Sequence, residues 1–143
     1  MTSAVEKLAP RLFDALLLAG RLLLAGIFVH EGVFLLTHFD GAAASMEKLG
    51  VPSAALVATI ALQLAAGLAI ASGFLTRYGA FALALFCLAT AALFHTHLSV
   101  RDELLHFEKD LAIAGGLFTL AVHGGGAWSI EALAPRWLRR LRA

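Results

Sequence analysis

The sequence predicts an all-α integral membrane protein, a four-helix bundle that forms one transmembrane domain over residues 1–143. Of its 143 residues, 60% are hydrophobic and 15% are charged, and the mean hydropathy is +0.84. A soluble domain is about half apolar and about a quarter charged. Crossing a bilayer takes about 20 apolar residues. Four stretches have roughly that length: residues 12–37, 53–75, 78–98 and 107–125.

Prolines and glycines predict where these helices begin and end. Pro10 precedes the first span, Pro52 opens the second and Pro135 follows the fourth, as expected of a residue without an amide hydrogen. Glycines 124–126 stop the fourth span. Between the first two spans, residues 40–50 predict a short amphipathic helix in the first outer loop, because their apolar residues recur at helical spacing.

The distribution of charge predicts the orientation in the membrane. Single crossings put the two termini and the turn between spans two and three on one side, together with eight of the eleven basic residues. These are Lys7, Arg11, Arg21, Arg77, Arg136, Arg139, Arg140 and Arg142. Basic loops stay in the cytoplasm, so we expect a multi-pass protein of the cell (inner) membrane with both termini cytoplasmic. The basic C-terminal residues favour anionic lipid headgroups as partners over nucleic acid.

The same threading gathers polar residues at the outer ends of the spans. Five of the six histidines fall there, and ionisable groups at membrane depth are functional candidates because burying them is costly. The predicted catalytic residues are His30, Glu31, His95, Lys109 and Asp110. Gln63, deeper in the second span, would form the floor of a pocket in which His30 and His95 also bind a cofactor.

Several interpretations of this cluster remain open. In one it is structural, with Lys109 neutralising Glu31 or Asp110. In another it is a quinone pocket, where histidines and carboxylates supply hydrogen bonds and a proton path. A metal site is less favoured because ligands would have to come from three spans, and a haem between His30 and His95 or a transport function is less favoured still. A single cysteine excludes an internal disulfide.

Six segments in a fixed order carry a family resemblance over residues 16–133. They are RLLLAGIFVHEG (21–32), MEKLGVPSAAL (46–56), LQLAAGLAIASGFLTRYGA (62–80), FHTH (94–97), EKDLAIAGGL (108–117) and GGGAWSIEAL (124–133). Together they resemble the DoxX family of small four-helix membrane proteins. The chain departs from the family's pattern at two places. Phe34 and its neighbours stand where the family often has a lysine, and Gln63 stands where it often has a glutamate.

The resemblance implies a role in membrane redox chemistry, since members of the family are linked to thiosulfate:quinone oxidoreduction and to quinone or oxidative-stress responses. The leading hypothesis is a membrane subunit of a redox complex, with quinone as cofactor and a protein partner. In it His95 contacts the quinone head and Glu31 or Asp110 passes protons. The alternative is a non-catalytic membrane anchor or assembly protein. Either is compatible with a homo-oligomer.

Overall fold

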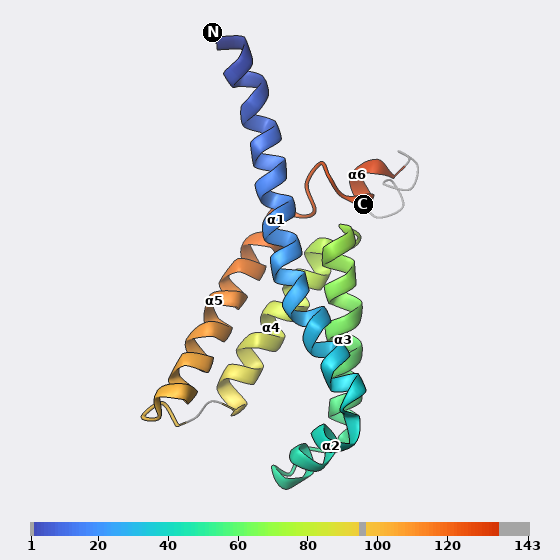
Figure 1. Cartoon of the computed structure of the whole chain (residues 1–143), viewed down its shortest axis with the longest axis vertical. Coiled ribbons are helices and arrows are strands. Elements are labelled where there is room, and N and C mark those ends of the chain that lie inside the picture. Colours follow the sequence, from blue (N-terminus) through green and yellow to red (C-terminus); the bar gives the residue numbers. More distant parts are fainter. Residues whose placement is uncertain (1, 95–96, 135–143) are drawn as a thin grey trace.

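The computed structural model describes residues 2–94 and 97–134, with side chains from Ala9 onward. Within these ranges every regular element is an α-helix, as predicted (Figure 1). The helices are α1 (Thr2–Thr37), α2 (Phe39–Lys48), α3 (Ser53–Ser72), α4 (Thr76–Phe94), α5 (Arg101–His123) and α6 (Ile130–Leu133).

The long helices α1, α3, α4 and α5 run up and down in chain order (Figure 1). Helix α1 packs on α3, α3 on α4 and α4 on α5, whereas the contact between α1 and α5 is small. One end of the molecule carries α2, the end of α4 and the start of α5, and is called the α2 end here. The opposite end, the α6 end, carries the start of α1, the α3–α4 turn and α6.

Three helices in the described residues are long and apolar enough to cross a membrane: Ala9–Thr37, Ser53–Ser72 and Thr76–Phe94. They correspond to the first three predicted spans. Helix α5 lies along α4, but six charged residues fall among its first ten residues. By its composition, α5 is therefore not among the three helices that are apolar enough to cross a membrane. The charged residues are Arg101, Asp102, Glu103, Glu108, Lys109 and Asp110.

The helix boundaries differ from the sequence prediction in physically simple ways. Pro10 lies inside α1 instead of preceding it, because a proline removes one backbone hydrogen bond without stopping the helix outright. Pro52 is the N-cap of α3, as expected. Helix α3 ends earlier than predicted, since Gly73 adopts a left-handed conformation (φ 75°) and caps it. The predicted boundary at Pro135 lies outside the described residues.

Small residues allow these helices to pack closely. A Cβ atom at Gly67 would lie 2.9 Å from the Val29 side chain of α1, and one at Gly79 would lie 3.2 Å from the Ala66 carbonyl oxygen of α3. Such close approach is typical of membrane helices. The hydrophobic core that results consists of Ala25, Phe28, Ala66, Ile70, Ala80, Leu83, Ala84, Cys87, Ala114, Leu117 and Leu120.

Candidate functional site

A cavity of about 560 Å³ lies near the α2 end, between α1, α2, α3 and α4. We call it the Gln63 pocket. Most of its lining is apolar, including Met46, Phe86 and Phe94. Four residues contribute polar side chains, namely Ser45, Thr59, Gln63 and Thr90. A pocket of this size, apolar with a few polar groups, is typical of sites for small organic ligands.

Gln63 is the most unusual residue of this pocket. It lies in the middle of α3 and is only 4% exposed. Its Oε1 atom accepts no hydrogen bond within the described part of the chain. A buried acceptor without a donor destabilises a fold by about 1–3 kcal/mol. Gln63 therefore places in the pocket wall a hydrogen-bond acceptor that no group of the described chain uses.

Thr90 connects the pocket to a carboxylate on the neighbouring helix. Its hydroxyl group donates to Asp110 Oδ2 over 3.1 Å, and the carbonyl oxygens of Phe86 and Cys87 lie at 3.1 and 2.9 Å. A hydroxyl group has one proton, so these three acceptors compete for it. Asp110 is half-buried and is held one hydrogen bond away from the pocket wall.

The structure places the predicted site residues unequally around this pocket. Gln63 lines it, and Asp110 reaches it through Thr90. His30, Glu31 and Lys109 are exposed and do not line it. On α1, Phe28 and Gly32 occupy the buried face. Because successive residues turn by about 100° around a helix, His30 and Glu31 fall outside this face. His95 lies outside the described residues.

The described residues do not contain the set of ligands that a metal site would need. No three side chains of histidine, cysteine, aspartate or glutamate gather there closely enough to share an ion. Cys87 is buried in the core of α4.

A second polar cluster lies at the α6 end and was not predicted from the sequence. From the sequence, Arg21 was assigned only to the basic residues of the cytoplasmic side. Arg21 is 2% exposed. Its guanidinium donates to the carbonyl oxygen of Gly125, and to that of Trp128 over 2.8 Å. The Glu131 carboxylate accepts from the Leu75 amide over 2.7 Å. Both interactions pin the segment after α5 to the rest of the bundle. An arginine inside an apolar stretch was the available signal, since such a charge needs partners.

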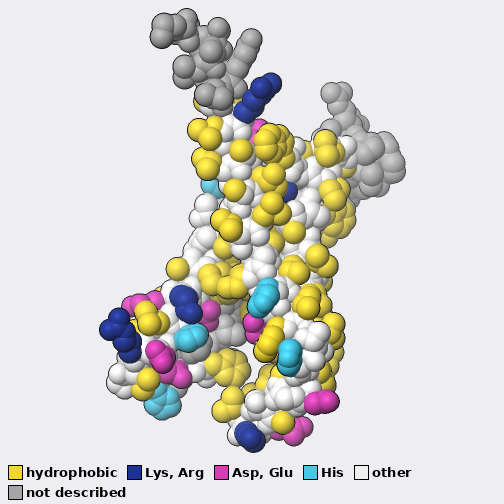
Figure 2. Space-filling model, in the orientation of Figure 1, with side chains coloured by type: hydrophobic (Ala, Val, Ile, Leu, Met, Phe, Trp, Pro, Cys, Tyr) yellow, Lys and Arg dark blue, Asp and Glu magenta, His cyan; other side chains and the backbone are white. Residues whose placement is uncertain are grey.

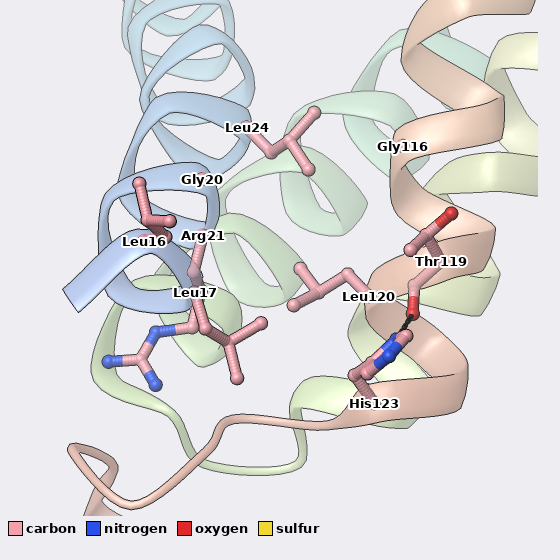
Figure 3. Close-up of a pocket in the computed structure, with 9 residues that line it drawn as sticks. All are labelled: Leu16, Leu17, Gly20, Arg21, Leu24, Gly116, Thr119, Leu120 and His123. Carbon is pink, nitrogen blue, oxygen red and sulfur yellow. Dashed lines mark hydrogen bonds between the residues drawn. The ribbon is translucent and has the colours of Figure 1, made fainter. Parts of the chain in front are cut away.

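A shallow groove of about 150 Å³ lies beside this cluster, between α1 and α5 (Figure 3). Leu17 and Leu24 of α1 and Leu120 of α5 extend into the space between the two helices, while the Arg21 guanidinium points away from it (Figure 3). A Cβ atom at Gly116 would lie 3.5 Å from the Leu24 side chain. This contact marks where α1 and α5 meet.

Three apolar helices of spanning length in the described part of the chain, with polar side chains fixed near both ends of the bundle, define a multi-pass helical membrane protein. Comparisons with known proteins identify it further. The DoxX family model matches residues 16–96. Inner membrane protein YqjF of Escherichia coli (strain K12) is 41% identical over 123 residues, which are 86% of this chain and 95% of YqjF. The chain belongs to the DoxX family and is an inner membrane protein.

A second relative, inner membrane protein YphA of Escherichia coli (strain K12), is 34% identical over 123 residues, 81% of this chain and 88% of YphA. No solved structure matches the chain significantly.

Proposed function

We propose that this protein is the membrane subunit of a redox system and binds a quinone or quinol head group in the Gln63 pocket. We also propose that α5 is the fourth span and that both termini are cytoplasmic. The support is the charge bias in the sequence, in which eight of the eleven basic residues fall on the side of the two termini and of the turn between the second and third predicted spans. The pocket then lies near the outer leaflet.

The observation that carries this proposal is the buried, unpartnered Gln63 amide oxygen in the wall of a mostly apolar cavity. A side-chain amide has both an acceptor oxygen and a donor NH₂ group. The oxygen can accept from a quinol hydroxyl group, and the NH₂ group can donate to a quinone carbonyl. One side chain thus suits both redox states, while the apolar walls suit the ring.

Asp110 supplies the base that quinol oxidation requires. Loss of two electrons by a quinol releases two protons, and a carboxylate within one hydrogen bond of the pocket can accept them in turn. Thr90 lies between the pocket and Asp110, so its hydroxyl group is the relay. The electrons pass to a redox-active partner protein, in keeping with a subunit rather than an independent enzyme.

Gln63→Leu tests the proposal. At a quinone concentration of 100 times Kd, ligand binding stabilises a protein by about 2.7 kcal/mol, and we expect the variant to lose most of this stabilisation. Without ligand, the variant should be at least as stable as the wild type, because an unpaired buried acceptor has been replaced by an apolar group of similar size. Melting temperatures in detergent, with and without a short-chain quinone, measure both effects.

Leu68→Ala is the matched control. Leu68 lies on the same helix but is 57% exposed and outside the pocket. Its quinone-dependent rise in melting temperature should equal that of the wild type. An equal rise in Gln63→Leu would contradict the proposal.

One observation favours a second candidate, a non-catalytic membrane anchor or assembly protein. His30 and Glu31 are exposed on α1, a candidate span. Ionisable side chains at that depth are normally covered, and a partner helix would cover them. For an anchor, quinone changes the melting temperature of neither the wild type nor Gln63→Leu.

A further inference from the structure

The contacts between α1 and α5 fix how these two antiparallel helices are aligned. Leu24 lies against Gly116. One turn toward the α6 end, Gly20 and Leu120 line the same groove from opposite sides (Figure 3). A step of four residues forward on α1 therefore corresponds to a step of four residues back on α5.

Extending this alignment toward the α2 end brings two opposite charges face to face. Seven residues after Leu24 stands Glu31, and seven residues before Gly116 stands Lys109. A step of seven returns to the same side of a helix within about 20° and covers about 10 Å of its length. Glu31 and Lys109 thus lie at the same level, on the facing sides of α1 and α5.

The two helices do not close around these charges. They diverge toward the α2 end (Figure 1), and both Glu31 and Lys109 are exposed, with no ion pair between them in the described structure. Figure 2 shows acidic, basic and histidine side chains gathered over the lower parts of α5 and of α1 and α2, on the two sides of a hollow. The α1–α5 cleft is this opening between Leu24–Gly116 and the α2 end.

Both walls of the α1–α5 cleft come close to residues that line the Gln63 pocket. Gly32, the neighbour of Glu31, packs on α3, where its added Cβ atom would lie 3.4 Å from the Gln63 Cβ atom. Asp110, the neighbour of Lys109, accepts the hydrogen bond of Thr90 in the pocket wall. Each facing charge is therefore one residue away from a group that touches the pocket lining.

We propose that the α1–α5 cleft is a gated lateral access route to the Gln63 pocket, closed by an ion pair between Glu31 and Lys109. This inference rests on the proposed function and specifies its ligand, a membrane-dissolved molecule with a polar ring and a long apolar tail. Opposite charges attract more strongly in a low-dielectric medium than in water. They favour closure when the cleft is empty, and a tail lying in the cleft holds the helices apart.

Cross-linking between cysteines placed inside the cleft tests the gate. Ile27 and Ile113 lie at matching levels between the Leu24–Gly116 contact and the charged pair. In full-length Cys87→Ala protein reconstituted in liposomes, Ile27→Cys with Ile113→Cys should react with a short bismaleimide. Adding Glu31→Lys should lower the yield several-fold through repulsion, and the charge swap Glu31→Lys with Lys109→Glu should restore it. A quinone with an isoprenoid tail should also lower the yield.

The matched control is the pair Leu24→Cys with Gly116→Cys, whose yield should respond neither to the charge changes nor to the quinone. The gate is refuted if Glu31→Lys leaves the Ile27–Ile113 yield unchanged, if the charge swap fails to restore it, or if the tailed quinone has no effect. The experiments that change only the charges contain no ligand, so their outcome does not depend on whether the protein binds a quinone. Quinone binding itself is tested by the Gln63→Leu melting experiment.

Discussion

Replacing Arg21 with alanine is expected to lower the free energy of unfolding by roughly 2–4 kcal/mol, because two carbonyl groups lose their donors. The guanidinium is buried and donates to the carbonyl oxygens of Gly125 and Trp128. It ties α1 to a segment more than a hundred residues further along the chain. Without it, that segment loses its main polar contact with α1. Thermal unfolding in detergent measures the loss.

Two further variants separate this role from a general effect of charge. Arg77 is exposed, and the one hydrogen bond that it makes within the described residues, to the His123 carbonyl oxygen, is long at 3.5 Å. Arg77→Ala should change stability by no more than about 0.5 kcal/mol. Arg21→Lys should fall between Arg21→Ala and the wild type, since an ammonium group lacks the planar fork that reaches both carbonyl groups. If Arg21→Ala has the same melting temperature as the wild type, Arg21 does not anchor this segment.

Gly73→Ala is expected to have a comparable effect, roughly 3 kcal/mol, from a left-handed backbone penalty of about 1–2 kcal/mol plus a steric clash. Gly73 has a φ of 75°. An added Cβ atom would lie 2.8 Å from the Ser129 Cα atom and 2.7 Å from Arg21 Nη1. The backbone contact cannot be relieved by rotating a side chain, so the segment that carries Ser129 must move.

Gly50 provides the matched control, since it has the same φ of 75° but no atom within 4 Å of an added Cβ atom. Gly50→Ala should therefore show only the backbone penalty, about 1–2 kcal/mol. Because Arg21 and Gly73 share one contact, the double variant Arg21→Ala with Gly73→Ala should be less destabilised than the two single effects combined. Equal melting temperatures of Gly73→Ala and Gly50→Ala would rule out the clash.

Most of the helical fold could be predicted from local sequence. Long apolar stretches and Pro52 located α1, α3 and α4, and helical spacing located α2. Whether α5 crosses the membrane could not be predicted in the same way. Its first half is charged, and its position along α4 depends on tertiary contacts, including the bond from Thr90 to Asp110.

The candidate site was harder to predict, because helices in a membrane are apolar both toward lipid and toward their neighbours, which leaves little amphipathic signal. Gln63 stood out as a polar residue in an apolar span, and it lines the pocket. Which side of α1 carries His30 and Glu31 could not be predicted from the sequence in the same way. Both fall outside the buried face of α1. Arg21 was missed because it was counted with the loop charges.

Photoaffinity labelling with an azido-quinone tests most directly whether the Gln63 pocket binds a quinone head group. If it does, label is expected on α2 and on the second half of α4, near Met46 and Phe94. Unlabelled quinone should compete for this label, and Gln63→Leu should abolish it. Label that spreads over exposed positions such as Leu23 and Leu68, resists competition and persists in Gln63→Leu would contradict quinone binding in the Gln63 pocket.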